Sequence, residues 1–128
     1  MTKLFKVLAV FFLAVMLSGC VTERLPAEDV DVLDVCSREI SVLQSKKYTP
    51  NSREKYEAAK SLLKKVDFSY IRRVETLDAI FSSLDAQVDK PDSRTQMLNF
   101  YYQYKGHSIR FVFNRYDNIV TRFEVIEK

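Results

Sequence analysis

The chain has 128 residues, of which 47% are hydrophobic and 29% are charged, and its formal net charge is +3. A chain of this length forms one domain with one modest core. Nucleic-acid binding needs a concentrated basic patch, and nothing in this sequence resembles one, so we expect no nucleic-acid partner.

The first 19 residues have the organisation of a secretory signal peptide. Lys3 and Lys6 precede an unbroken apolar run at 7–17, and this run suits the roughly 7–15 residues of a signal's apolar core. As a helix it would span about 16 Å, against roughly 30 Å of bilayer hydrocarbon, so it is too short to be an anchor itself. An ordinary buried N-terminal helix is disfavoured, because the charge, the length and the small residues Ser18 and Gly19 all agree with a signal.

The sequence Leu17-Ser18-Gly19-Cys20 resembles the lipobox of bacterial lipoproteins. The resemblance implies a diacylglyceryl group on the Cys20 thiol, cleavage before Cys20, and acylation of the freed amine with a fatty acid such as palmitate. Each buried CH₂ contributes about 0.8 kcal/mol, so one fatty chain binds a bilayer marginally and several bind it stably.

The residues after Cys20 point to a location. In enterobacterial lipoproteins, an aspartate directly after the lipid cysteine favours retention in the inner membrane, whereas Val21 and Thr22 follow here. The resemblance therefore implies a protein that is lipid-anchored in the outer membrane and faces the periplasm. In a Gram-positive host, the same sequence implies the outer side of the cell membrane.

Cleavage before Cys20 leaves a chain with a net charge of +1, because the leader 1–19 carries two lysines and no acidic residue. We expect residues 20–28 to be the lipidated cysteine and a tether, whose eight residues after Cys20 reach about 28 Å at most. Residues 29–128 are expected to form a single α+β periplasmic domain.

Lipidation of Cys20 leaves Cys36 as the single free thiol, which excludes an intramolecular disulfide by counting. A lone cysteine on an apolar helix stripe is usually a small core hydrophobe. The alternative is an intermolecular disulfide, because thiols in exported proteins oxidise in pairs.

Two segments in the first half have the spacing of amphipathic helices. The first runs from about residue 27 to 47, although the alternation at 30–32 would also suit an extended start. The second covers Asn51–Val66, with Asn51 as N-cap and Glu54 completing a capping box. The connection between them is short, which predicts an antiparallel hairpin of helices.

A third helix ends near Leu84 and starts between Ser69 and Thr76, and the polar segment 85–95 has the composition of a loop. From Leu98 on, the apolar period changes to two, which indicates β-strands. We expect three antiparallel strands, at 98–104, 109–114 and 119–125, joined by turns at 105–107 and 116–118.

One face of these strands carries many aromatic residues and needs a cover, and the apolar stripes of the helices match it. We therefore expect a two-layer α+β fold, with two or three N-terminal helices packed on a C-terminal three-stranded antiparallel β-meander. In the third strand, Ile119, Thr121, Phe123 and Val125 are expected on the covered face.

The opposite face of the expected sheet is mostly polar. Such a face either meets water or receives a partner protein, and it is our candidate partner-binding face. Its residues are Asn99, Tyr101, Gln103, Arg110, Val112, Asn114, Arg122 and Glu124.

The order of signal, lipid cysteine, short tether, helices and meander resembles BamE, the SmpA/OmlA family of small outer-membrane lipoproteins. Tyr101-Tyr102-Gln103-Tyr104 resembles that family's aromatic first strand, and the segment 109–120 resembles its second strand, acidic turn and third strand. The family's Gly-Met-Thr and Gly-x-Pro segments are replaced here by Val74-Glu75-Thr76 and Ala86-Gln87-Val88, and the helix at 51–66 has no counterpart. The resemblance implies an accessory, non-catalytic role beside the machine that inserts β-barrel proteins into the outer membrane.

No catalytic or metal-binding pattern stands out. His107 is the single histidine and lies in an expected turn, the carboxylates are scattered, and the chain has two glycines. It shows neither zinc-ligand spacing nor a Gly-rich phosphate loop. We expect no enzyme, no metal, no small-molecule substrate, and no cofactor other than the covalent lipid on Cys20.

These patterns favour a membrane-anchored lipoprotein that binds other cell-envelope proteins as a structural or assembly accessory. Two alternatives stay open. A pilotin-like carrier of a secretion-system subunit would offer a deep apolar groove to a partner helix. An inhibitor of an envelope enzyme would insert a loop into a cleft, and 85–95 is the candidate loop.

Overall fold

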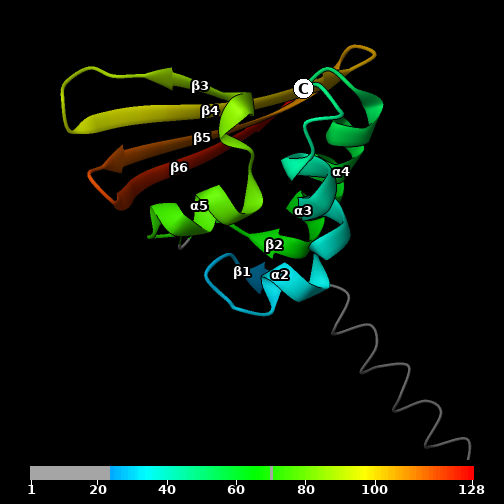
Figure 1. The fold of residues 1–128 in the computed structure, drawn as a ribbon, viewed down its shortest axis with the longest axis horizontal. Coiled ribbons are helices and arrows are strands. Elements are labelled where there is room, and N and C mark those ends of the chain that lie inside the picture. The colour runs from blue at the N-terminus through cyan, green and yellow to red at the C-terminus, as the bar shows by residue number, and fades with distance from the viewer. Residues whose placement is uncertain (1–23, 70) are drawn as a thin grey trace, which may run out of the picture.

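The computed structural model describes residues 24–69 and 71–128, so the expected leader, Cys20 and residues 21–23 lie outside the described residues. The described chain is an α+β domain in which helices lie on one side of an antiparallel sheet (Figure 1). Its elements are β1 (Leu25–Pro26), α2 (Val32–Val35), α3 (Ser37–Gln44), α4 (Arg53–Lys65), β2 (Val66–Asp67), α5 (Val74–Ile80), the 3₁₀ helix η1 (Ser83–Asp85), β3 (Ala86–Asp89), β4 (Thr95–Tyr104), β5 (His107–Tyr116) and β6 (Ile119–Glu127).

The large sheet has four strands, in the order β3-β4-β5-β6, where the sequence predicts three. The additional strand, β3, lies in the segment 85–95 that is expected to be a loop, so that expectation is wrong for 86–89. Ala86 and Val88 of β3 lie opposite Phe100 and Leu98 of β4. Four residues are too few to show a period of two, and Val88 is 51% exposed, so β3 leaves almost no apolar signal in the sequence.

The folded body begins before the expected boundary at residue 29. β1 pairs in parallel with β2, with Leu25 beside Val66, and the Ala27 N–H donates to the Asp67 carbonyl (2.8 Å). Ala27 is buried. The tether expected over 20–28 is therefore wrong at its C-terminal end, because a pairing between residues 40 positions apart holds 25–27 in place.

The first expected helix is two helices, since the chain breaks at Cys36 between α2 and α3 (φ −106°, ψ 21°). Cys36 is free and fully buried, so the core-hydrophobe alternative is confirmed, and burial raises the pKa of its thiol.

The capping box expected at the second helix is wrong. Ser52 is the N-cap of α4 and accepts from the Lys55 N–H (3.2 Å), whereas the Asn51 side chain accepts from Gln103 of β4 (3.0 Å).

A bulge in β6 changes which face of the sheet the first residues of the strand lie on. Asn114 lies opposite Arg122, but Arg115 lies opposite Val120, so Thr121 is the extra residue of the strand. Val120 is buried and Ile119 is 58% exposed. The expectation that Ile119 and Thr121 lie on the covered face is therefore wrong.

The core lies between the sheet and the helices, where aromatic rings meet. Phe81, directly after α5, stacks on Phe100 of β4 with ring centroids 4.6 Å apart. Phe68, directly after β2, meets Phe111 edge-on (5.6 Å) and also contacts Phe123 (5.6 Å). Aromatic pairs add about 0.5–1.5 kcal/mol each beyond the area they bury, so these two short connecting segments hold the helices against the sheet.

Candidate functional site

The outer face, which we define as the face of β3–β6 turned away from the helices, carries the expected partner-binding residues. Asn99, Val112 and Glu124 lie side by side across β4, β5 and β6. Tyr101 lies beside Arg110, and Asn114 beside Arg122. The structure therefore brings these residues together, as the alternation in the sequence predicts.

Gln103 belongs to the rim of the outer face. Its N–H donates to the Pro50 carbonyl (3.2 Å) and its side-chain amide donates to Asn51 (3.0 Å), both in the loop before α4. This loop covers the part of β4 that extends beyond β3. The Gln103 side chain therefore already has a partner within the domain.

Two further apolar residues belong to the outer face, although the sequence reasoning missed them. Met97 lies beside Asn114, and Ile126 beside Arg110. Both are half-buried, as are Tyr101 and Val112. The signal for Met97 and Ile126 is the same alternation, continued past the expected ends of the strands. The face therefore carries more apolar residues than the eight expected residues suggest.

Tyr101 and Arg110 form a pair on the outer face, because their side chains are in contact. The guanidinium carbon lies 4.8 Å from the centroid of the tyrosine ring, a cation–π contact worth about 0.5–1 kcal/mol at an exposed site. Among the described residues, neither Arg110 nor Arg122 makes an ion pair. Tyrosine and arginine are enriched among residues that dominate protein–protein binding energy, and here the sheet register holds both in place.

Glu28 joins the start of the domain to α5. Its carboxylate accepts from the backbone N–H groups of Arg72 and Arg73 (2.8 and 2.9 Å), from the Arg73 guanidinium (2.9 Å) and from the Thr76 hydroxyl (2.8 Å). Burial by itself would raise the pKa of Glu28, but these hydrogen bonds outweigh it and lower the pKa to about 2. The carboxylate of Glu28 thus accepts four hydrogen bonds within the domain, and we assign this cluster, which we call the Glu28 clamp, a structural role.

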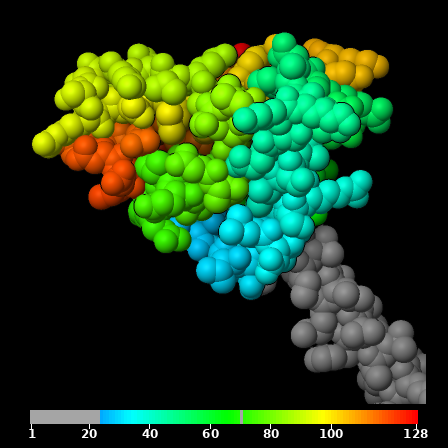
Figure 2. All heavy atoms as spheres, in the orientation of Figure 1, coloured from blue at the N-terminus to red at the C-terminus, as the bar shows by residue number. Residues whose placement is uncertain are grey.

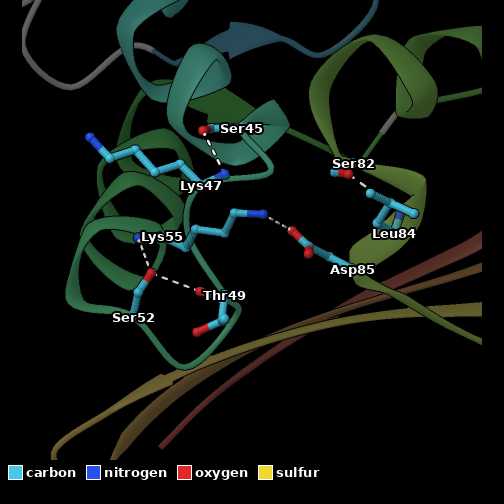
Figure 3. A network of polar contacts seen from close by, with 8 residues as sticks. All are labelled: Ser45, Lys47, Thr49, Ser52, Lys55, Ser82, Leu84 and Asp85. Carbon is cyan, nitrogen blue, oxygen red and sulfur yellow. Dashed lines mark hydrogen bonds and ion pairs between the residues drawn. The ribbon is translucent and has the colours of Figure 1, made fainter.

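A second polar cluster lies inside the domain. Lys55 of α4 points to Asp85 of η1 and forms an ion pair with it (Figure 3), and the two side chains are 1% and 7% exposed. The nearby Tyr102 hydroxyl is buried without a hydrogen-bond partner among the described residues. Burial and the negative charge of Asp85 raise the pKa of Tyr102. All three side chains are buried, so we assign this cluster to the core.

The two alternatives from the sequence also have structural counterparts. An apolar hollow lies between α2 and α5, lined by residues that include Val32, Leu33 and Ile80, with Glu28 and Glu75 at its border. This is the groove that a carrier would use, and its border is acidic. The loop that an inhibitor would use is reduced, because 86–89 form β3 and pair with β4.

Within residues 24–69 and 71–128, no three His, Cys, Asp or Glu side chains gather closely enough to hold a metal ion. His107 is exposed at the start of β5. Across the same residues, no helix has the length and apolar character needed to span a membrane.

Comparison of the chain with protein-family models, curated proteins and solved structures finds no match.

Proposed function

We propose that the protein is a lipid-anchored envelope protein that presents the outer face of its sheet to another envelope protein, as a non-catalytic structural or assembly accessory. The observation that carries the proposal is the place of β1 and α2 in the fold. β1 and α2 form the base of the molecule, and the sheet lies at the opposite side (Figures 1 and 2).

The proposed anchor is close to this base in the sequence. Three residues separate Cys20 from Arg24 in the sequence, and the four residue steps from Cys20 to Arg24 span about 14 Å at most, at ~3.3–3.6 Å per residue. A lipid on Cys20 would therefore hold the base against the head groups of the bilayer. The sheet would then lie on the side of the domain farther from the membrane, where a protein partner can reach its outer face.

The size and chemistry of the outer face support this use. Strands β4, β5 and β6 have nine or ten residues and β3 has four. At about 4.8 Å between strands and ~3.3 Å per residue, they make a face on the order of 500 Å², and a standard interface buries about 800 Å² per partner. The Tyr101–Arg110 pair supplies an anchor, and the half-buried Met97, Val112 and Ile126 supply apolar contact surface. A partner with a matching apolar patch and acidic side chains opposite Arg110 and Arg122 would fit.

The resemblance to the SmpA/OmlA family leads us to propose the assembly of outer-membrane proteins as the process served. The outer membrane, with the domain in the periplasm, is the location that we propose with it. Both proposals depend on the sequence at Cys20 and on the aromatic strand at 101–104.

In vivo photo-crosslinking tests the proposed function. A photoreactive residue at Arg110 should crosslink one specific envelope protein in intact cells, and Tyr101→Ala should reduce the yield of that product severalfold. The matched control is a photoreactive residue at Lys60, which is exposed on α4 and away from the sheet. Identical products from both positions would refute the assignment of the outer face.

A further inference from the structure

Along the edge of β6, several backbone groups have no hydrogen-bond partner among the described residues. Ser108 and Lys128 exchange two backbone hydrogen bonds (2.9 Å each), and in an antiparallel pair such exchanges recur at every second residue. The backbone groups of Arg122, Glu124 and Ile126 therefore point toward β5. Those of Phe123, Val125 and Glu127 point the other way, and no described residue hydrogen-bonds to them there.

The other exposed edges of this sheet are short or covered. The end of β4 bonds to Pro50, and β3 has four residues and is followed by Lys90 and Pro91. Short, charged and proline-flanked edges are the usual protection against strand addition. The beginning of β6 is also covered, because the Val120 N–H donates to the Arg72 carbonyl (2.8 Å). The open stretch of β6 therefore starts after Thr121.

A hollow runs beside this open stretch. Ser69, Ile71 and Arg72 line one side of it, and Phe123 and Val125 of β6 line the other. Ile71 is buried, and both β6 residues are partly buried against the core. A strand added to β6 would find an apolar wall beneath its alternate side chains.

Positive charge is concentrated at the closed end of the hollow. Arg72 and Arg122 border it there, both are exposed, and neither makes an ion pair with a described residue. Glu124, two residues after Arg122, also borders the hollow but lies farther from that end. Two guanidinium groups attract a carboxylate and repel an amine.

We propose that the open edge of β6 binds the C-terminal segment of a partner protein as an added antiparallel strand. Antiparallel addition runs the segment toward Thr121, where the Arg72 backbone blocks further pairing, so the chain ends there with its carboxylate beside Arg72 and Arg122. Apolar side chains would lie opposite Phe123 and Val125, and main-chain hydrogen bonds to β6 would supply affinity. A parallel strand would instead place an N-terminal amine beside the two arginines. This surface adjoins the outer face and shares Arg122 and Glu124 with it, and the inference does not depend on the lipid anchor.

A labelled peptide tests the inference by fluorescence anisotropy on the purified full chain in detergent. The probe is fluorescein-Val-Thr-Ile-Lys-Phe-Ser with a free carboxylate, which places Phe and Ile opposite Phe123 and Val125. We expect saturable binding, and about tenfold weaker binding for the C-terminal amide and for Arg72→Gln, because a charge-assisted contact is lost. Arg94→Gln, which changes an arginine outside the hollow, is the matched control and should leave the affinity unchanged. No saturable binding, or equal affinity for acid and amide, would overturn the proposal.

Amide hydrogen exchange tests the register. In the free protein, the N–H groups of Phe123, Val125 and Glu127 should exchange at least about tenfold faster than those of Glu124 and Ile126, and the peptide should slow them by a similar factor. Val125→Pro removes one outward N–H without removing a bond to β5, and it should abolish binding of the probe. Protection of the three outward amides without peptide would overturn the proposal in favour of a second copy or another part of this chain on the edge.

Discussion

Removal of Asp85 should destabilise the domain strongly, because it leaves the Lys55 ammonium group buried without its partner. The Lys55 side chain is 1% exposed and the Asp85 side chain 7% exposed. Breaking a buried ion pair at one end costs about 3–5 kcal/mol, out of a total stability of roughly 5–15 kcal/mol for a domain. At the lower figure, Asp85→Ala should lower the melting temperature by roughly 12–24 °C.

The single variants Lys55→Met and Asp85→Leu, measured beside the double variant that combines them, make the prediction specific. Replacing both partners with apolar residues, Lys55→Met with Asp85→Leu, should bring the stability within about 1 kcal/mol of the original chain, because no buried charge remains. Urea unfolding followed by circular dichroism measures all the variants. The control is Arg53→Ala, whose partner Glu57 forms an exposed pair with it (64% and 59% exposed) and contributes about 0.5 kcal/mol or less.

The reasoning would be refuted by either of two results. If Asp85→Ala costs less than about 1 kcal/mol, the lysine reaches water and is not held in the core. If the double variant loses as much as the sum of the two single variants, the pair has no coupling energy. A coupling of at least about 2 kcal/mol supports the buried pair as the link between α4 and η1.

Three further predictions follow from single residues. Because its pKa is lowered, the Glu28 carboxylate stabilises the fold fully above about pH 4.5, and the fold loses this contribution as the pH falls toward about 2. Glu28→Gln should therefore cost about 3 kcal/mol at pH 7 in urea unfolding and should make stability less dependent on pH below about 4.5. An unchanged pH dependence in acid would contradict this role of Glu28. Tyr102→Phe removes a buried hydroxyl that has no partner among the described residues, so thermal unfolding should show equal or higher stability, and a loss above about 1 kcal/mol would reveal a hydrogen bond to that hydroxyl. Cys20→Ser should leave an unprocessed precursor in the inner membrane, detected by its larger mass, and normal maturation would refute lipidation.

The long strands β4 and β5 could be predicted from the sequence because each carries the alternation over many residues. Their register follows from the turn between them: Lys105 and Gly106 have positive φ (48° and 79°) and join Tyr104 directly to His107. Two-residue hairpins favour this conformation. Since the register of β4 against β5 sets the outer face, its position could also be predicted.

The parts that escaped prediction depend on contacts between distant residues. β1 has two residues and exists because β2, 41 positions later, pairs with it. The bulge at Thr121 interrupts the alternation in β6 without any glycine or proline to mark it. Lys55 lies on the buried face of α4 with Ala59 and Leu62, and its burial follows from Asp85, which no local pattern connects to it.

The orientation of the domain on the membrane is the most direct test of the central claim. A fluorophore attached by cysteine at Val30, at the base, and one at Arg110, on the outer face, can be compared in vesicles that carry spin-labelled lipid head groups. A helix layer and a sheet separate the two positions by roughly 20 Å, so we predict strong quenching at Val30 and little at Arg110. Strong quenching at Arg110 would place the outer face on the bilayer and contradict its role as a surface for a protein partner.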